Sequence, residues 1–106
     1  MVIASAAQAT GSSIDGQLNR PQGLAVDPVR NLLYVSEYGN KRVSVFDIAR
    51  NQENKFSFGF QGKLGRAGKG DGEFQCPIGI CLDSTRSLLY VFDYDLQHAN
   101  VWSAFH

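Results

Sequence analysis

The fold is decided by the stretch at residues 15–48, which reads DGQLNRPQGLAVDPVRNLLYVSEYGNKRVSVFDI. Residues 71–104 read DGEFQCPIGICLDSTRSLLYVFDYDLQHANVWSA, so the second stretch follows the first at a constant offset of 56 residues without a gap. Twelve of the 34 aligned positions are identical, including the run Leu32–Val35 and its counterpart Leu88–Val91. An internal repeat of this length indicates an array of similar structural units.

Each copy has the pattern of several short β-strands. In the first copy, β-type segments at 24–26, 32–37, 42–47 and 56–60 are separated by turn residues such as Asp27-Pro28 and Gly39-Asn40. The segment 56–60 alternates phenylalanine with small residues, as strands with one buried face do. The run 32–35 is apolar on both faces, which suits a sheet covered on both sides. Four-stranded sheets stacked in this way are the blades of a β-propeller, so we expect an all-β fold.

These residues resemble an NHL repeat. The first copy carries the family's motifs as PQGLAVD at 21–27, LYV at 33–35 and NKRVSVF at 40–46, with Glu37 standing where Asp is usual. The second copy keeps PIGICLD at 77–83 and LYVFD at 89–93 but has LQHA at 96–99 in place of the third motif. That difference leaves open the turn geometry of the second copy and any carboxylate–arginine pair there.

The resemblance implies two four-stranded antiparallel propeller blades. We expect an N-terminal segment at 1–14, a first blade at 15–62, a glycine-rich basic loop at 63–70, and a second blade at 71–106 that lacks its fourth strand. Because two blades do not close a propeller, the six-bladed ring that the resemblance implies needs either further blades of a longer chain or association of copies. We favour a homotrimer in which residues 1–6 add an outer strand to a neighbouring copy. A frayed tail or a short helix is the alternative for that segment.

Charge is balanced overall but uneven along the chain. Ten Lys and Arg residues oppose ten Asp and Glu residues, which excludes a strong global attraction to nucleic acid or anionic membranes. Residues 41–70 nevertheless carry seven basic against two acidic side chains, and residues 71–106 carry one basic against five acidic. We expect candidate binding residues on one propeller face, at the loops that connect the strands. They are Tyr38, Lys41, Arg42, Lys63, Arg66, Lys69 and Tyr94.

Three functions are compatible with this pattern. A non-enzymatic scaffold that binds a protein or peptide is the preferred interpretation, with a solvated connector as the plain reading of the basic loop. Single-stranded RNA bound through basic and tyrosine side chains is the first alternative. A metal-dependent lyase or hydrolase in the central channel is the second, although the histidines that hold a metal in six-bladed lyase relatives are absent from this sequence. No membrane partner is expected, because no apolar run is long enough to span a bilayer.

We identify no catalytic, metal-binding or cofactor-binding residues. The expected channel strands at 24–26 and 80–82 contain no His or Glu, and we expect Asp27 and Asp83 to cap the turns that follow them. Asp93 and Asp95, two apart on a strand, could bind a hard cation, but a plain acidic rim is the preferred interpretation.

The two cysteines, Cys76 and Cys81, are too far apart along a strand for a disulfide, at roughly 16 Å. We expect both to be free, with Cys81 a small core residue, which favours a reducing, intracellular setting.

Overall fold

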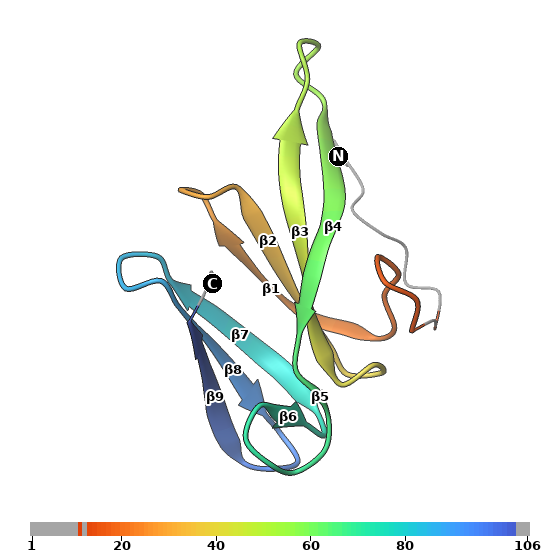
Figure 1. Cartoon of the computed structure of the whole chain (residues 1–106), viewed down its shortest axis with the longest axis vertical. Helices are drawn as coiled ribbons and strands as arrows, with labels where there is room; N and C mark the ends of the chain where they lie inside the picture. Colours follow the sequence, from red (N-terminus) through yellow and green to blue (C-terminus); the bar gives the residue numbers. More distant parts are fainter. Residues whose placement is uncertain (1–10, 12, 104–106) are drawn as a thin grey trace.

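The structure, a computed structural model, describes residue 11 and residues 13–103. The described chain is built entirely of β-strands and their connections, so the prediction of an all-β fold is confirmed (Figure 1). The strands are β1 (Pro21–Asp27), β2 (Leu32–Glu37), β3 (Arg42–Arg50), β4 (Phe56–Leu64), β5 (Arg66–Ala67), β6 (Glu73–Phe74), β7 (Pro77–Asp83), β8 (Leu88–Asp93) and β9 (His98–Ser103).

Strands β1 to β4 form an antiparallel sheet in sequence order, here called the first sheet. Its fourth strand runs to Leu64, four residues beyond the end predicted from the phenylalanine alternation. A register shift between Val45 and Phe46 allows this extension, because it lets Gly62–Leu64 pair with the start of β3. Gly62 in this segment favours a loop in the sequence although it lies in a strand.

Strands β7, β8 and β9 form a second antiparallel sheet, here called the second sheet. It repeats the register of the first: Ala25 pairs with Tyr34 in one, and Cys81 pairs with Tyr90 in the other. Within the described residues the second sheet has three strands, so β9 has no outer neighbour. The proposal that residues 1–6 supply such a strand to another copy concerns residues outside the described part of the chain.

A short structured linker joins the two sheets. Lys63 and Leu64, expected in a loop, belong to β4, and β5 pairs in parallel with β6 further along the linker. Gly65 makes this turn possible: it has a positive φ of 77°, and a side chain there would collide with the ring of Phe74. The linker is therefore held in place by the buried Phe74 ring.

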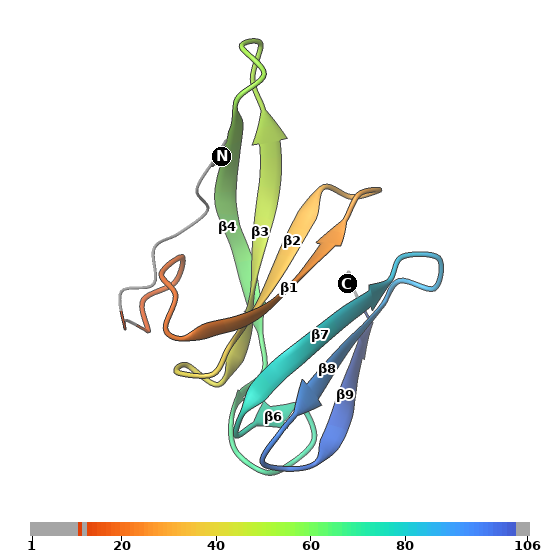
Figure 2. The ribbon, with the colours of Figure 1, turned by 180° about the vertical axis from the view of Figure 1, so that it is seen from behind.

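The two sheets pack against each other through their inner strands, with β7 beside β1 and β2 (Figures 1 and 2). A shared core joins Tyr34 and Val43 of the first sheet to Leu89 and Val91 of the second, with Phe74 between them. The backbones approach closely at Gly23, where a Cβ would lie 2.6 Å from the carbonyl oxygen of Ile78. This contact is the apolar stacking of neighbouring sheets that the sequence predicts.

Two further features concern the surface. Cys81 is exposed, so its predicted place in the core is wrong: it lies on the face of the second sheet that points away from the first. Among residues 11 and 13–103 there is no helix of sufficient length and apolarity to cross a membrane.

Candidate functional site

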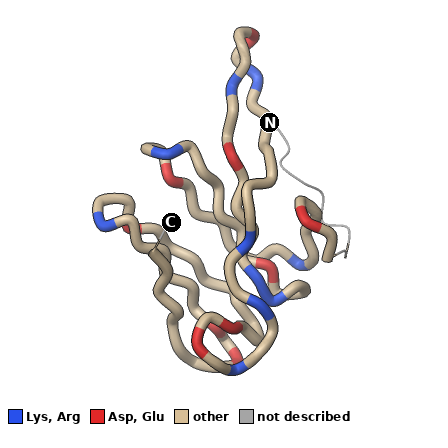
Figure 3. Tube along the Cα trace, in the orientation of Figure 1, with Lys and Arg blue, Asp and Glu red and all other residues tan. Residues whose placement is uncertain are grey.

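The connections that the sequence singled out gather at one end of the molecule. We call this end the loop face and define it by the β2–β3 turn (38–41), the linker (63–73) and the β8–β9 turn (94–97). Figures 1 and 2 show the three connections together at the lower end of the molecule. Residues of both charge signs occur along them, as the colours of the chain trace in Figure 3 show.

Tyr38 and Lys41 occupy the β2–β3 turn. The ammonium of Lys41 lies 5.3 Å from the Tyr38 ring centroid, and the guanidinium of Arg20 lies 5.9 Å from the same ring, so the ring is flanked by two cations. Lys41 also donates a hydrogen bond to the carbonyl of Gln75 at the entrance to the second sheet. The lysine therefore ties the two sheets together and is only partly available to a ligand.

The basic residues of the linker are largely paired. Lys63 forms an ion pair of 2.9 Å with Asp15, and Arg66 forms one of 2.9 Å with Glu73. The backbone N–H of Gly70, followed by Arg66, lowers the pKa of Glu73 below its usual 4.5, so that carboxylate stays charged near neutrality. The local excess of positive charge along the sequence is thus partly cancelled in space.

Lys69 and Tyr94 are the predicted residues with the most open positions. Lys69 is exposed and forms no salt bridge with any residue in the described part of the chain. Tyr94 lies in the β8–β9 turn and leaves 58% of its surface in water, next to the exposed Asp95. An aromatic ring with this exposure is a natural anchor for a binding partner.

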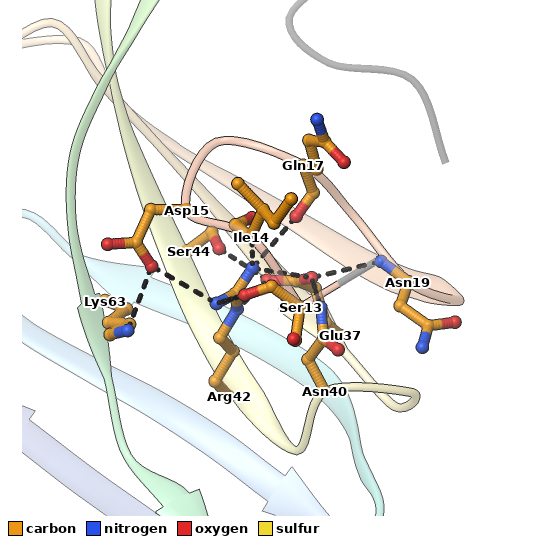
Figure 4. A network of polar contacts seen from close by, with 10 residues as sticks. All are labelled: Ser13, Ile14, Asp15, Gln17, Asn19, Glu37, Asn40, Arg42, Ser44 and Lys63. Atoms are coloured by element: carbon orange, nitrogen blue, oxygen red, sulfur yellow. Dashed lines mark hydrogen bonds and ion pairs between the residues drawn. The ribbon is translucent and has the colours of Figure 1, made fainter. Parts of the chain in front are cut away.

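Arg42 lies elsewhere: it is a buried residue at the start of β3. Only 4% of it is exposed, and its guanidinium donates to Glu37 at 2.8 Å and to the carbonyls of Ser13 and Gln17 at 3.0 and 2.9 Å (Figure 4). Glu37 is itself fully buried. Besides the Arg42 guanidinium, its carboxylate accepts hydrogen bonds from the Asn19 backbone N–H and from the side chains of Asn40 and Ser44. Arg42 is therefore placed to hold the first sheet to the segment before β1, out of reach of a surface ligand.

The second sheet has a buried aspartate where the first sheet has the buried Glu37. Asp93, also fully buried, stands at the position of Glu37 and accepts bonds from the backbone N–H groups of Gln75, Cys76 and Leu96. These donors are backbone groups, so the bonds from Asp93 to the segment before β7 do not need an arginine. His98 stands at the position that Arg42 has in the first sheet. The turn keeps its shape as well, since Gln97 has a φ of 57° and Lys41 one of 52°.

Both carboxylate oxygens of Asp93 already accept backbone N–H groups, which disfavours a cation shared with Asp95. Across residues 11 and 13–103, no three His, Cys, Asp or Glu side chains lie close enough together to hold a metal ion.

The predicted turn caps are confirmed. The Asp27 carboxylate accepts the backbone N–H groups of Val29 and Arg30 and pairs with the Arg30 guanidinium at 3.0 Å, and Asp83 bonds Arg86 in the same way. Burial raises the pKa of Asp27, but these hydrogen bonds outweigh it, and its pKa lies below the usual 3.8.

Sequence reasoning missed the roles of Glu37, Asp93 and Arg20. The position shared by Glu37 and Asp93, an acid at the end of the second long strand in both copies, was the signal that could have indicated a buried carboxylate.

Comparison with known proteins agrees with the repeat. The sequence model of the NHL repeat matches residues 18–46. Two curated relatives, described as NHL repeat-containing protein 2 from Bos taurus and from Homo sapiens, are 32% and 31% identical over 84 residues. The chain belongs to the NHL-repeat family. The matches cover 78% of this chain and 12% of each relative, so the chain spans about an eighth of their length. NHL repeats generally serve as non-enzymatic scaffolds for protein interactions.

Proposed function

We propose that this chain is a non-enzymatic scaffold that binds a protein or peptide through its loop face. The observation that carries the proposal is the exposed Tyr94 on a loop face whose connections carry charged residues of both signs. Tyrosine and arginine are enriched at the energetic centres of protein interfaces, and interface rims are polar with mixed charge. The Tyr38 ring, which has the cations of Arg20 and Lys41 beside it, adds a second aromatic side chain on the same face.

The charge arrangement favours a protein over RNA. A nucleic-acid interface needs lysines and arginines whose charge is free to neutralise phosphates. On this face Lys63 and Arg66 already have carboxylate partners, and Lys41 is bonded to a backbone carbonyl. Lys69 contributes one open positive charge, which is too little for a phosphate-binding surface.

Selection of peptides from a displayed library on the purified chain, followed by calorimetric titration of the selected peptides, tests the proposal. We expect Tyr94→Ala to weaken the selected peptides by about tenfold or more, as truncation of an aromatic anchor does. The matched control is Phe56→Ala, because Phe56 is an aromatic residue at the far end of the first sheet. Equal binding to the unchanged chain and to Tyr94→Ala contradicts the proposal.

A second measurement addresses the RNA alternative directly. Fluorescence anisotropy with a labelled oligouridine should give no binding tighter than about 100 μM at physiological salt, a level typical of non-specific contacts. Tighter binding that weakens steeply with added salt, and weakens further in Lys69→Ala, would favour RNA over a protein partner.

A further inference from the structure

The two sheets leave two apolar faces uncovered. The front face is the side of the first sheet turned away from the second, where Leu24 and Val26 of β1 are 66% and 52% exposed. The back face is the side of the second sheet turned away from the first, where Phe92 and Val101 are 40% and 56% exposed. Exposed apolar side chains gathered on a sheet face indicate a surface that another molecule covers.

The repeat shows what kind of surface fits each face. The front face corresponds, at the 56-residue offset, to the side of the second sheet that packs on the first: Leu24 and Val26 match Ile80 and Leu82. The back face corresponds to the side of the first sheet that receives this contact. Cys81, Tyr90 and Val101 there match the packed residues Ala25, Tyr34 and Val45.

The uncovered faces are therefore the two halves of a contact that the chain already makes once internally. We propose that the chain binds a second copy of itself head to tail, with the front face of one copy on the back face of the next. The contact would repeat the internal packing of the second sheet on the first. This inference does not depend on the partner proposed for the loop face.

Polar groups at the edge of the contact agree with this pairing. Across the internal contact Arg30 donates to the Ser87 hydroxyl at 2.7 Å. The equivalent residues are Arg86 on the back-face side and Asn31 on the front-face side, and an asparagine amide oxygen can accept the same bond. One internal bond is not repeated, because Phe92 stands at the place of Ser36, whose hydroxyl donates to the Ile78 carbonyl. The Phe92 ring is larger than the buried Ser36 side chain, so at this point two copies must lie further apart than the two sheets of one chain do.

A contact between different faces is heterologous, so copies add in one direction until a ring closes. With the two blade-like sheets that the structure describes in each copy, closed rings of about four to eight blades hold two to four copies. Three copies are expected, since they give the six blades implied by the resemblance.

The experiment uses two variants that each disable one face: Leu24→Lys on the front face and Val101→Lys on the back face. The unchanged chain should sediment at a multiple of its 11.6 kDa mass, three chains being expected. Each variant alone should sediment as a single chain. An equimolar mixture should form a dimer and nothing larger, because one intact front face remains to meet one intact back face. Both substitutions introduce lysine, so attraction between opposite charges cannot drive the mixed dimer.

The matched control is Val29→Lys, since Val29 is 74% exposed but lies in the β1–β2 turn outside both faces. Its assembly should equal that of the unchanged chain. A well-folded monomer of the unchanged chain, judged by circular dichroism, overturns the proposal and points to further blades or another protein as the occupant. Failure of the two variants to complement each other overturns it as well, even if either variant is unstable alone, because complementation would restore a folded dimer.

Discussion

The substitution Arg42→Met tests the buried ion pair of the first sheet most directly. Methionine keeps an unbranched apolar stem but removes the guanidinium that donates to Glu37 at 2.8 Å and to the carbonyls of Ser13 and Gln17. The Glu37 carboxylate is fully buried and would then be left with neutral donors only. The carbonyls before β1 would lose their donor at the same time.

The expected loss follows from this geometry. Removing one partner of a buried ion pair costs about 3–5 kcal/mol, because the remaining charge stays out of water. A domain of this size unfolds with a free energy of about 5–15 kcal/mol, so the loss is about a fifth of the total or more. With a urea dependence of about 2 kcal/mol per molar, the unfolding midpoint should fall by about 2 M. The assay is urea unfolding followed by circular dichroism at one fixed protein concentration, since association would shift the midpoint.

Lys55→Met is the matched control, because it breaks a lysine–glutamate pair of 3.6 Å whose lysine side chain is 71% exposed and which lies outside the loop face and both sheet faces. We expect no measurable change in midpoint for this variant, as surface pairs contribute little. The double variant Glu37→Leu/Arg42→Met should recover part of the loss, since it removes both buried charges together. A midpoint for Arg42→Met equal to that of Lys55→Met would refute a stabilising role for the buried pair.

Three further predictions concern single positions. Gly23→Ala should lower the melting temperature, because the added methyl group would lie 2.6 Å from a carbonyl oxygen of β7. Such overpacking typically costs about 1–3 kcal/mol. Gly59→Ala should leave the melting temperature unchanged, because the space around Gly59 is open. The pKa of Asp27 is lowered in the folded chain, so its stabilising contribution is present above about pH 4 and is lost as the pH falls through the folded-state pKa. The difference in urea midpoint between the unchanged chain and Asp27→Asn should therefore shrink from pH 5 to pH 2. Burial, followed by the charge of nearby aspartates, raises the pKa of Cys76, so a Cys81→Ser chain at pH 8 should react with a thiol reagent only after urea is added.

The strands and their order could be predicted from the sequence because the repeat states the same pattern twice. The alternation in 56–60 and the turn residues after Val26 and after Glu37 mark strand ends correctly to within a few residues. The extension of β4 could not be predicted, since Gly62 favours a loop locally and only the register shift beside Val45 brings it into the sheet. Local propensity carries no information about such a shift.

The candidate site was predicted less completely. Arginines are mostly exposed, so Arg42 was grouped with the surface lysines, and only its partner Glu37 explains why it is buried. The ion pairs of Lys63 with Asp15 and of Arg66 with Glu73 join residues from separate segments, and the sequence charge count could not anticipate them. Cys81 lies in an apolar strand as predicted, but which face of that strand is covered depends on the neighbouring sheets.

The buried guanidinium of Arg42 also fixes how the chain can be divided. The match to the NHL-repeat sequence model covers residues 18–46 only. The carbonyls that Arg42 binds belong to Ser13, Ile14 and Gln17, and the outer strand of its sheet continues to Leu64. A fragment cut at the borders of the matched motif would thus lose the carbonyls that bind Arg42 and the outer strand β4. A transplantable module for grafting or recombination therefore runs from about residue 13 to Leu64, and engineered junctions belong at Gly65.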